Sequence, residues 1–398
     1  MKTAKLANIA DIQTGPFGSQ LHKEDYVDAG TPIVTVEHLG RRKLSNKNVP
    51  FVSESDAHRL SKYSLEQGDI VFSRVGSVDR CSQVSENEAG WLFSGRCLRV
   101  RPNDSMIDPD YLYYFLTLPK TQEFIRAIAV GATMPSINTS LLGEVDIDLP
   151  PLSEQVGIAK GLGALDDKIS TNVRIINATD SLVDVLYSRV SKMPTEQSFA
   201  EVAQVFGGST PSTKNDAFWD GDINWATPTD ITALGGPWIG DTSRKITEAG
   251  LASMSSSLHP ENSILLTSRA TIGAIALASG PIATNQGFIV VEAPDELTPW
   301  LFAQMKARKR EFEAWANGAT FMELSRGNFK KLPFIGCSDD DLQAFNDAAW
   351  PLLKRAQAAQ KETEVLARTR DELLPLLMSG RITVGEAENA ADEAASES

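Results

Sequence analysis

The chain has 398 residues, a length typical of two or three domains, and its 42% hydrophobic and 23% charged residues are ordinary for a globular protein. The formal net charge of −14 excludes an overall basic surface of the kind that binds nucleic acid. Five of the acids fall in residues 385–398, so a local basic face on the rest of the chain stays possible.

The sequence has no run of about 18 uncharged apolar residues, and its first residues lack an apolar core of signal-peptide length. We therefore expect a cytoplasmic protein without a membrane span. The three cysteines form no CxxC pair and the four histidines have no metal-ligand spacing. No disulfide, metal site or bound cofactor is predicted.

Residues 1–150 are predicted to form an α+β domain. Short β-rich runs at 32–36, 69–74 and 95–100 are each flanked by Gly, Pro, Asn or Asp. Asp108 opens a helical stretch rich in tyrosine, whose rings we expect to pack in the core. A further strand at 144–149 closes the domain.

A long helix is predicted for residues 151–194, directly after Leu-Pro-Pro-Leu-Ser-Glu-Gln at 149–155. The two prolines end an extended segment, and Ser153 is expected to cap the helix, with Glu154 in its first turn. A heptad pattern typical of a coiled coil follows, formed by Ile158, Leu162, Leu165, Ile169, Ile176, Val183, Leu186 and Val190, with Asn172 and Thr179 on the same seam.

The order of elements then repeats in residues 195–337, after Met193-Pro194. Leu6-Ala7-Asn8-Ile9-Ala10 is echoed by Phe199-Ala200-Glu201-Val202-Ala203, and each is followed by a polar loop with glycine. The strand that ends at Arg74 is echoed by one that ends at Arg269, and Gly131-Ala132-Thr133 by Gly318-Ala319-Thr320. The chain is therefore predicted to contain two similar globular domains.

A second long helix is predicted for residues 338–384, capped by Asp339-Asp340-Asp341 and ended near Ser379-Gly380. Pro351 and Pro375 are expected to kink it or to mark its ends. Its seam consists of Leu342, Phe345, Ala349, Leu352, Ala356, Ala359, Leu366, Leu373 and Leu377, with Thr363 and Arg370 as polar interruptions. Residues 385–398 are predicted to be a disordered acidic tail.

Two helices with complementary seams are expected to pair as an antiparallel coiled coil and to hold the two domains about a helix length apart. Two similar domains at a fixed separation can read two sites on duplex DNA. The sequence lacks a phosphate loop, a nucleophile elbow and the [DNS]PP[YFW] stretch of amino-methyltransferases. We therefore predict a protein with no catalytic residues of its own.

The Pro-Pro-Leu-Ser-Glu-Gln entry into a long helix and the domain–helix–domain–helix repeat resemble the specificity (S) subunit of Type I restriction-modification enzymes. The stretch from Leu373 to Ile382 is also similar to this family. One departure is Leu332–Ser338, which replaces the Pro-Pro-Leu-Ser-Glu-Gln motif in the second repeat.

The resemblance implies a DNA-binding subunit of a restriction system. Each globular domain is then a target recognition domain for one half of a split sequence, and the coiled coil fixes the gap. Two methyltransferase (modification) subunits dock on it and supply S-adenosylmethionine binding and adenine methylation. Restriction subunits, which use ATP, join them to cut DNA. The alternative reading is a duplicated protein-interaction scaffold without DNA binding.

Candidate DNA contacts are polar residues in loops beside the repeated elements. In the first domain they are Gln13, Thr14, Ser19, Gln20, Arg41, Arg42, Lys43, Arg74, Ser77, Thr133, Ser136 and Asn138. In the second they are Ser209, Thr210, Ser212, Thr213, Lys214, Arg269, Thr271, Asn285, Gln286, Thr320, Ser325, Arg326 and Asn328. Arg74 and Arg269 stand out because they follow strands of matching sequence. A solvated loop or a local cap explains any single residue as well. For the basic stretch 306–310 we favour phosphate or solvent over base contacts.

Overall fold

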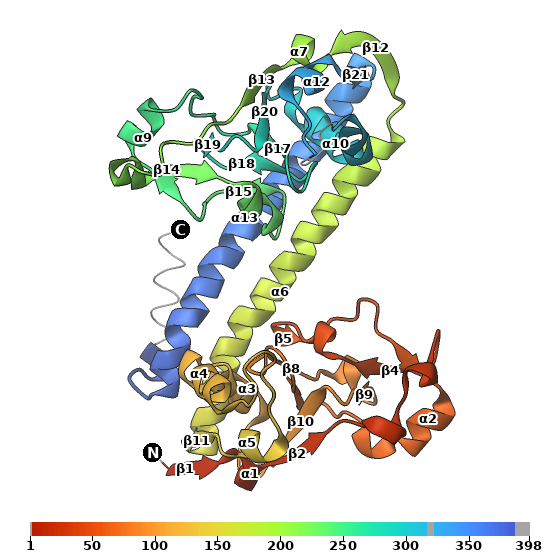
Figure 1. Ribbon diagram of the computed structural model, residues 1–398, viewed down its shortest axis with the longest axis vertical. Helices are drawn as coiled ribbons and strands as arrows, with labels where there is room; N and C mark the ends of the chain where they lie inside the picture. Colours follow the sequence, from red (N-terminus) through yellow and green to blue (C-terminus); the bar gives the residue numbers. More distant parts are fainter. Residues whose placement is uncertain (1, 317–321, 387–398) are drawn as a thin grey trace. The chain divides into compact units, whose positions relative to one another are not determined.

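A computed structural model describes residues 2–316 and 322–386 (Figure 1). The chain divides into two compact units. The first consists of the residues up to Asp167 together with those from Ala367 onward, and the second of Lys168–Leu366. None of the described helices is long and apolar enough to cross a membrane.

The first unit is built on a five-stranded sheet in the order β2-β10-β7-β8-β5. Its strands are β2 (Ala10–Thr14), β10 (Cys97–Pro102), β7 (Ile70–Ser73), β8 (Cys81–Gln83) and β5 (Arg42–Lys43). A smaller sheet contains β3 (Tyr26–Val27), β6 (Phe51–Val52), β4 (Thr31–Val34) and β9 (Leu92–Phe93), and β1 (Lys2–Lys5) pairs with β11 (Asp146–Leu149). The short helices are α1 (Leu6–Ile9), α2 (Glu54–Arg59), α3 (Pro109–Leu116), α4 (Pro119–Ile128) and α5 (Thr139–Gly143).

The tyrosine-rich stretch forms α3, and its rings lie in the core as predicted. Asp108 caps this helix by accepting a hydrogen bond from the Tyr111 backbone N–H. Tyr111, Tyr113 and Tyr114 are all buried, since α3 packs between the sheet and the start of the long helix that follows β11.

The second unit has the same plan. Its five-stranded sheet runs β13-β20-β17-β18-β15, which matches β2-β10-β7-β8-β5 strand for strand. The strands are β13 (Gln204–Gly207), β20 (Phe288–Glu292), β17 (Ile264–Thr267), β18 (Ile275–Ala278) and β15 (Trp238–Ile239). A ribbon of β12 (Met193–Ser198) and β21 (Pro333–Gly336) matches β1 and β11. The short helices are α7 (Phe199–Val202), α8 (Pro228–Thr232), α9 (Glu248–Ala252), α10 (Thr298–Ala307), α11 (Lys309–Trp315) and α12 (Arg326–Lys331).

The small sheets repeat as well. β14 (Trp219–Ala226) pairs parallel with β19 (Ala283–Thr284) and antiparallel with β16 (Lys245–Ile246). In the first unit β4 pairs parallel with β9 and antiparallel with β6 in the same way. The predicted duplication is therefore confirmed, and these shared pairings keep their direction, while β3, which pairs with β6, has no counterpart in the second unit.

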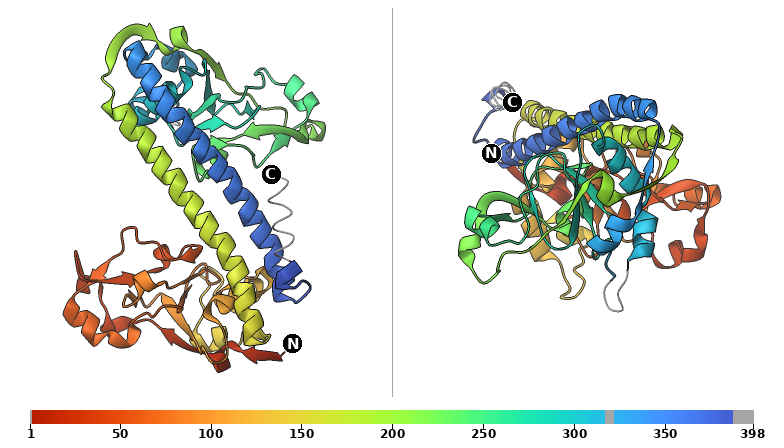
Figure 2. Two further views of the ribbon diagram at one scale, coloured as in Figure 1. Left: turned by 180° about the vertical axis from the view of Figure 1, so that it is seen from behind. Right: turned by 90° about the horizontal axis from the view of Figure 1, so that it is seen from above.

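The two long helices are α6 (Leu152–Arg189) and α13 (Asp339–Met378), and each contributes to both units. In the first unit Ile158 and Leu162 of α6 share a core with Leu374 and Leu377 of α13. In the second unit Val183 of α6 shares a core with the early part of α13. The helices run alongside each other within each unit in Figures 1 and 2. Early residues of one thus meet late residues of the other, which is antiparallel pairing.

The ends of the helices correct two predictions. Ser153 is not the cap of α6, because the helix already begins at Leu152 and the Pro151 carbonyl accepts from Glu154 and Gln155. For α13 the cap is Ser338, whose hydroxyl accepts a hydrogen bond from the Asp341 N–H. The helix therefore starts directly after β21 although the second repeat lacks the Pro-Pro-Leu-Ser-Glu-Gln motif.

The end of α13 agrees with the predicted glycine stop. Gly380 has a φ of 67°, its N–H bonds to the Leu377 carbonyl, and the Arg381 N–H reaches back to Leu376. This pair of backbone hydrogen bonds is a Schellman motif. Pro351 lies inside the helix rather than at an end, since α13 continues unbroken past it.

The seam of α13 is also shifted by one residue in places. Leu353 and Leu374 are buried, whereas the predicted Leu352 and Leu373 are only partly buried. A strict heptad drifts around a straight 3.6-residue helix by about 20° per repeat, and the domains cover part of the surface beside the seam. Of the predicted acidic tail, residues 387–398 lie outside the described part of the chain.

Candidate nucleic-acid interface

Loops from four parts of the first unit meet at the ends of its strands. We call residues 14–20, 74–77, 94–96 and 130–138 the first loop face. The Arg74 guanidinium donates to the Gly95 carbonyl at 3.1 Å and lies 5.8 Å from the centre of the Phe17 ring. The Ile137 N–H donates to the Arg74 carbonyl, and Gly76 donates to Pro135. These bonds join segments that are far apart in the sequence.

The second unit has an equivalent second loop face, formed by residues 207–214, 268–273, 285–287 and 322–328. The Arg269 guanidinium pairs with Glu323 at 2.9 Å, and the Leu324 N–H donates to the Ser268 carbonyl. The Thr210 hydroxyl donates to the side chain of Gln286. The Arg326 guanidinium lies beside Gly207.

The backbone hydrogen bonds correct the predicted match between Arg74 and Arg269. The backbone N–H of Arg74 donates to the Arg96 carbonyl beside the β7–β10 pair. At the matching place beside the β17–β20 pair, the backbone N–H of Ser268, not that of Arg269, donates to the Gly287 carbonyl. Arg74 is therefore equivalent to Ser268, and Arg269 to Val75. The sequence match placed the two arginines one residue out of register, so the two loop faces present different side chains at this position.

About half of the predicted contact residues are exposed on the two loop faces. They are Ser77, Thr133, Asn138, Thr210, Ser212, Thr213, Lys214, Arg269, Thr271, Gln286, Ser325 and Arg326. Asn138 and Ser325 occupy equivalent positions and also have a local role, because each caps the helix that follows it by accepting a backbone N–H. Ser19 lies in the short 3₁₀ turn Gly18–Gln20, and Thr320 lies outside the described residues.

Seven other predicted residues are partly buried. Gln13 and Thr14 lie on β2, and Gln20 accepts a hydrogen bond from the Tyr63 hydroxyl at 2.6 Å. Ser136 donates to the Val130 carbonyl, and the Asn285 side chain accepts from the Gly287 N–H. The remaining two are Ser209 and Asn328.

The basic stretch Arg41-Arg42-Lys43 faces the long helices. Arg41 pairs with Asp371 of α13 at 2.7 Å. Arg42 donates to the Gly163 carbonyl of α6, and its guanidinium stacks over Tyr114. Burial disfavours the charge of Arg42, but Tyr114 and three nearby carboxylates outweigh this effect and raise its pKa. The structure thus gives this stretch a role in attaching the domain to the helices.

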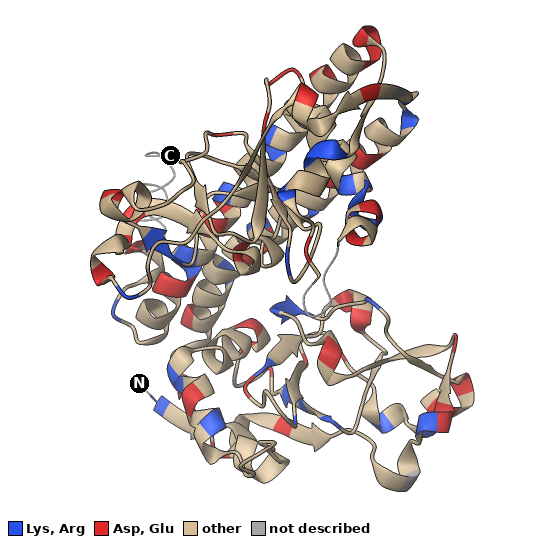
Figure 3. Cartoon of the chain, turned by 45° about the horizontal axis from the view of Figure 1, so that its top comes forward, with Lys and Arg blue, Asp and Glu red and all other residues tan. Residues whose placement is uncertain are grey.

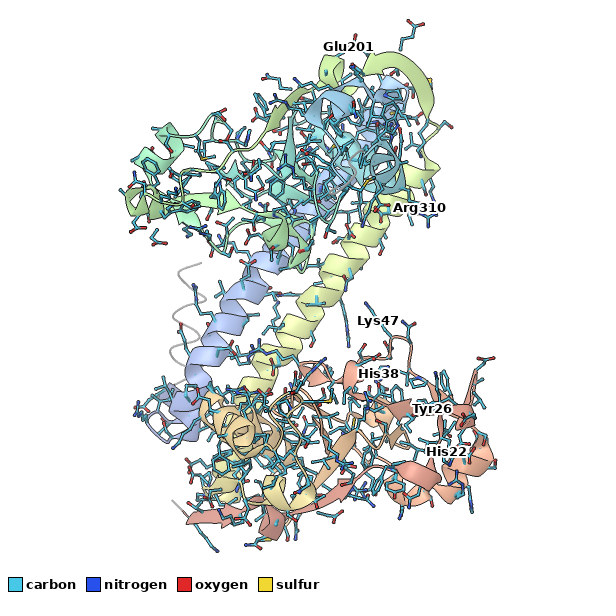
Figure 4. All side chains as sticks on the ribbon, in the orientation of Figure 1. His22, Tyr26, His38, Lys47, Glu201 and Arg310 are labelled. Carbon is cyan, nitrogen blue, oxygen red and sulfur yellow. The ribbon has the colours of Figure 1, made fainter. Side chains whose placement is uncertain are left out.

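In the basic stretch 306–310, some side chains are paired within the second unit and others are exposed. Lys306 pairs with Asp180 and Asp184 of α6, at 2.7 and 2.9 Å. Arg308 is buried, binds Glu311 through two nitrogens, and donates to the Pro333 carbonyl. The predicted phosphate or solvent role is therefore wrong for Lys306 and Arg308. Lys309 and Arg310 are exposed, and Arg310 projects from α11 in Figure 4.

The distribution of charged residues and of possible metal ligands bears on the kind of ligand that the loop faces could bind. Basic and acidic residues are interspersed within each unit in Figure 3. His22 and His38 stand apart in the first unit (Figure 4), and no group of three or more His, Cys, Asp or Glu in the described part of the chain could hold a metal ion. Each loop face offers hydroxyl, amide and guanidinium groups, which are the groups that bond to base edges and phosphates.

A comparison with protein-family models shows to which family this chain belongs. The model of the Type I restriction modification DNA specificity domain matches residues 1–179 and again 196–335. The chain belongs to this family. It is a specificity subunit of the Type I restriction-modification class, and its two matches coincide with the two halves of the repeat.

Similar proteins agree. The MjaX specificity subunit of Methanocaldococcus jannaschii, named as putative, is 23% identical over 91% of this chain and 89% of its own length. The MjaIX specificity subunit of the same organism is 32% identical, over 46% of this chain and 44% of its own length. The crystal structure of an S subunit from M. genitalium has the same fold, with a TM-score of 0.64, 16% identity and coverage of 94% of this chain and 95% of that one.

Sequence reasoning missed several residues of the specificity subunit that position its parts. Gln155, in the Pro-Pro-Leu-Ser-Glu-Gln motif, is buried and bonds both the Asp108 N–H and the Pro150 carbonyl. It thereby ties α6 to the cap of α3. Trp219, Trp225 and Arg244 lie beside the second loop face. The tryptophans at 219 and 225 were the available signal, because they follow closely after a predicted contact loop, residues 209–214.

Proposed function

We propose that each loop face of this specificity subunit reads one half of a split duplex DNA sequence. The observation that carries the proposal is the duplication of one scaffold with two different sets of exposed polar loops. Where the first face has Val75 and Ser136, the second has Arg269 and Glu323, and Arg74 of the first face is matched by Ser268, which is buried. The same frame with different hydrogen-bonding groups suits two different half-sites on an asymmetric target.

We further propose that α6 and α13 set the gap between the half-sites. Each helix is long, at about 60 Å for roughly 40 residues. The observation that supports this proposal is the antiparallel pairing of their seams within each unit. In this proposal the chain has no catalytic residues, and two methyltransferase subunits with S-adenosylmethionine, and restriction subunits with ATP, dock on it.

The test is to map DNA methylation in the host with and without this gene. A bipartite methylated motif that disappears on deletion, and returns with the gene, is the expected result. A gel-shift with the methyltransferase subunits present should then show tighter binding to this motif than to random duplex. Binding of the partner subunits with no preference for any sequence would contradict the proposal and would favour a scaffold.

A further inference from the structure

The loop Gly207–Lys214 of the second loop face is held in one conformation at its start. A Cβ atom on Gly208 would lie 1.9 Å from the Asn285 carbonyl oxygen and 2.4 Å from that of Thr284. Only glycine allows the two backbones to approach this closely. The Ser209 N–H then donates to the Thr284 carbonyl at 3.0 Å, which fixes the loop against the end of β19.

Two tryptophans of β14 support the rest of this loop. The Trp225 indole N–H donates to the Ser209 carbonyl at 3.1 Å, and the Trp219 indole N–H donates to the Ser212 carbonyl at 3.2 Å. Both rings are buried and meet edge to face, with centroids 5.0 Å apart. The only polar atom of each indole is thus used to hold a carbonyl of the loop.

The hydroxyls of the loop are also held. Ser209 Oγ accepts from the N–H groups of Ser255 and Ser256, at 3.2 and 3.3 Å. The Thr210 hydroxyl donates to Gln286 on the neighbouring loop. Beyond these anchors, Ser212, Thr213 and Lys214 are exposed. The loop therefore presents exposed polar side chains on a fixed backbone, which lowers the entropy cost of binding.

Arg244 borders the same loop. The carbon at the centre of its guanidinium lies over the Trp219 ring, 3.6 Å from the centroid. Arg244 remains exposed, and it forms no ion pair with a carboxylate of the described residues. The bend that carries it, directly before β16, is held at Ser243, whose N–H donates to Asp230 at 2.9 Å. Burial opposes the charge of Asp230, but hydrogen bonds from Thr227 and Ser243 outweigh it and lower the pKa of that carboxyl.

We propose that Gly207–Lys214 is a pre-formed reading element for the second half-site, with Trp219 and Trp225 as positioning residues and Arg244 as a contact to the DNA phosphate backbone. The proposal rests on the proposed function. The tryptophan support is specific to one domain, because Ile33 of β4 stands where Trp225 stands in β14 and its side chain has no N–H to donate. A guanidinium stacked on a fixed ring is a pre-oriented phosphate ligand.

The test uses the complete complex with its methyltransferase subunits and the motif that wild-type complex methylates. In the double variant Trp219→Phe/Trp225→Phe an aromatic ring remains at each position, but both indole N–H groups and part of the ring volume are lost, so the control must lose a buried indole as well. Discrimination against base substitutions in one half-site should fall by roughly tenfold, the value for two neutral hydrogen bonds, while discrimination in the other half-site stays. The control is Trp238→Phe, which removes the indole bond to Leu353 of α13 and should leave both half-sites unchanged.

Arg244→Gln gives an independent readout. It should weaken binding to cognate and random duplex by the same factor and reduce the salt dependence of binding by about one released ion. Unchanged discrimination in the double tryptophan variant, an equal loss at both half-sites, or an unchanged salt dependence in Arg244→Gln would overturn the proposal. If wild-type complex itself does not discriminate between sequences, the proposed function fails instead.

Discussion

At the scale of single residues, the arginines of the two loop faces have different surroundings. Arg74 is held by the Gly95 carbonyl and the Phe17 ring, whereas Arg269 is held by a carboxylate, Glu323. An exposed ion pair of this kind contributes little to stability, because water competes for both charges. Arg269 can therefore leave Glu323 for a base edge or a phosphate at small cost.

The first prediction concerns these arginines. Arg269→Ala should weaken binding to the cognate duplex by about 1–3 kcal/mol and relax one half-site, and Arg74→Ala should do the same for the other. Titration of the assembled complex with duplexes substituted in one half-site at a time measures this. Glu323→Gln is the control, since it removes the partner but keeps Arg269. Wild-type affinity in both alanine variants would exclude them as contacts.

The second prediction concerns Tyr111, Tyr113 and Tyr114. Burial raises the pKa of all three phenols, and Asp166 raises that of Tyr114 further by charge and by accepting its hydroxyl proton in a hydrogen bond of 2.7 Å. A phenol whose pKa is higher in the folded state stabilises that state below its unfolded pKa of about 10, and the contribution is lost as the pH rises above this value.

An alkaline titration followed by phenolate absorbance and circular dichroism should therefore show these three of the six tyrosines ionising only together with unfolding. Tyr114→Phe is the matched variant and should remove one late-ionising group. Ionisation of all six tyrosines at about pH 10 with an intact native spectrum would contradict the burial of α3.

At the scale of elements, polar side chains of the two long helices form specific contacts with each other. In the first unit Arg370 of α13 pairs with Asp166 of α6, which also receives the Tyr114 hydroxyl. Burial disfavours the charge of Arg370, but Asp166 and Asp371 outweigh it and raise the pKa. In the second unit the Asn172 amide donates to Glu362 at 2.8 Å. Buried polar groups on a seam are well suited to fixing its register.

The third prediction follows from the pair Asp166–Arg370. Because removal of one partner leaves a buried unpaired charge, Asp166→Asn or Arg370→Met alone should destabilise the first unit by about 3–5 kcal/mol. Combining Asp166→Leu, Arg370→Met and Tyr114→Phe should restore much of this loss. Denaturant unfolding of the full chain measures both. A single variant as stable as the wild type would mean that the pair is not buried in solution.

The sequence predicted these elements unevenly, for physical reasons. Periodicity and repeated turns are local signals, so the long helices, the strands and the duplication could be read directly. The cap at Ser153 was wrong because the helix begins one residue earlier. The match of Arg74 with Arg269 was wrong, and Leu352 is only partly buried beside the buried Leu353, because register and burial depend on contacts with distant segments. Trp219 and Trp225 follow the Gly207–Lys214 loop closely in the sequence, but the hydrogen bonds by which their indole N–H groups hold it depend on the folded arrangement.

The candidate site was the least predictable part. Loop residues such as Ser77, Thr213 and Lys214 are exposed as expected, whereas Arg42 and Gln20 are engaged inside the first unit. A polar residue in a loop has the same sequence signature whether it faces solvent or a carbonyl of another loop. Only the folded arrangement of the loops separates the two roles.

At the scale of the whole molecule, we propose that the subunit recognises two half-sites and that its two long helices set the distance between them. The two units divide α6 between Asp167 and Lys168, and α13 between Leu366 and Ala367. Insertions at these two points add length to both helices and leave the contacts within each unit in place. They therefore lengthen the two helices that are proposed to set the gap, and they leave both loop faces unchanged.

The most direct measurement maps the methylated motif of complexes that carry one inserted heptad at both points. Seven residues add about 10 Å of helix, so the gap should lengthen by about three base pairs while both half-sites stay the same. The control carries the heptad in α6 alone, which breaks the pairing and should abolish specific methylation. An unchanged gap in the doubly inserted subunit would contradict the proposal that the helices set the spacing.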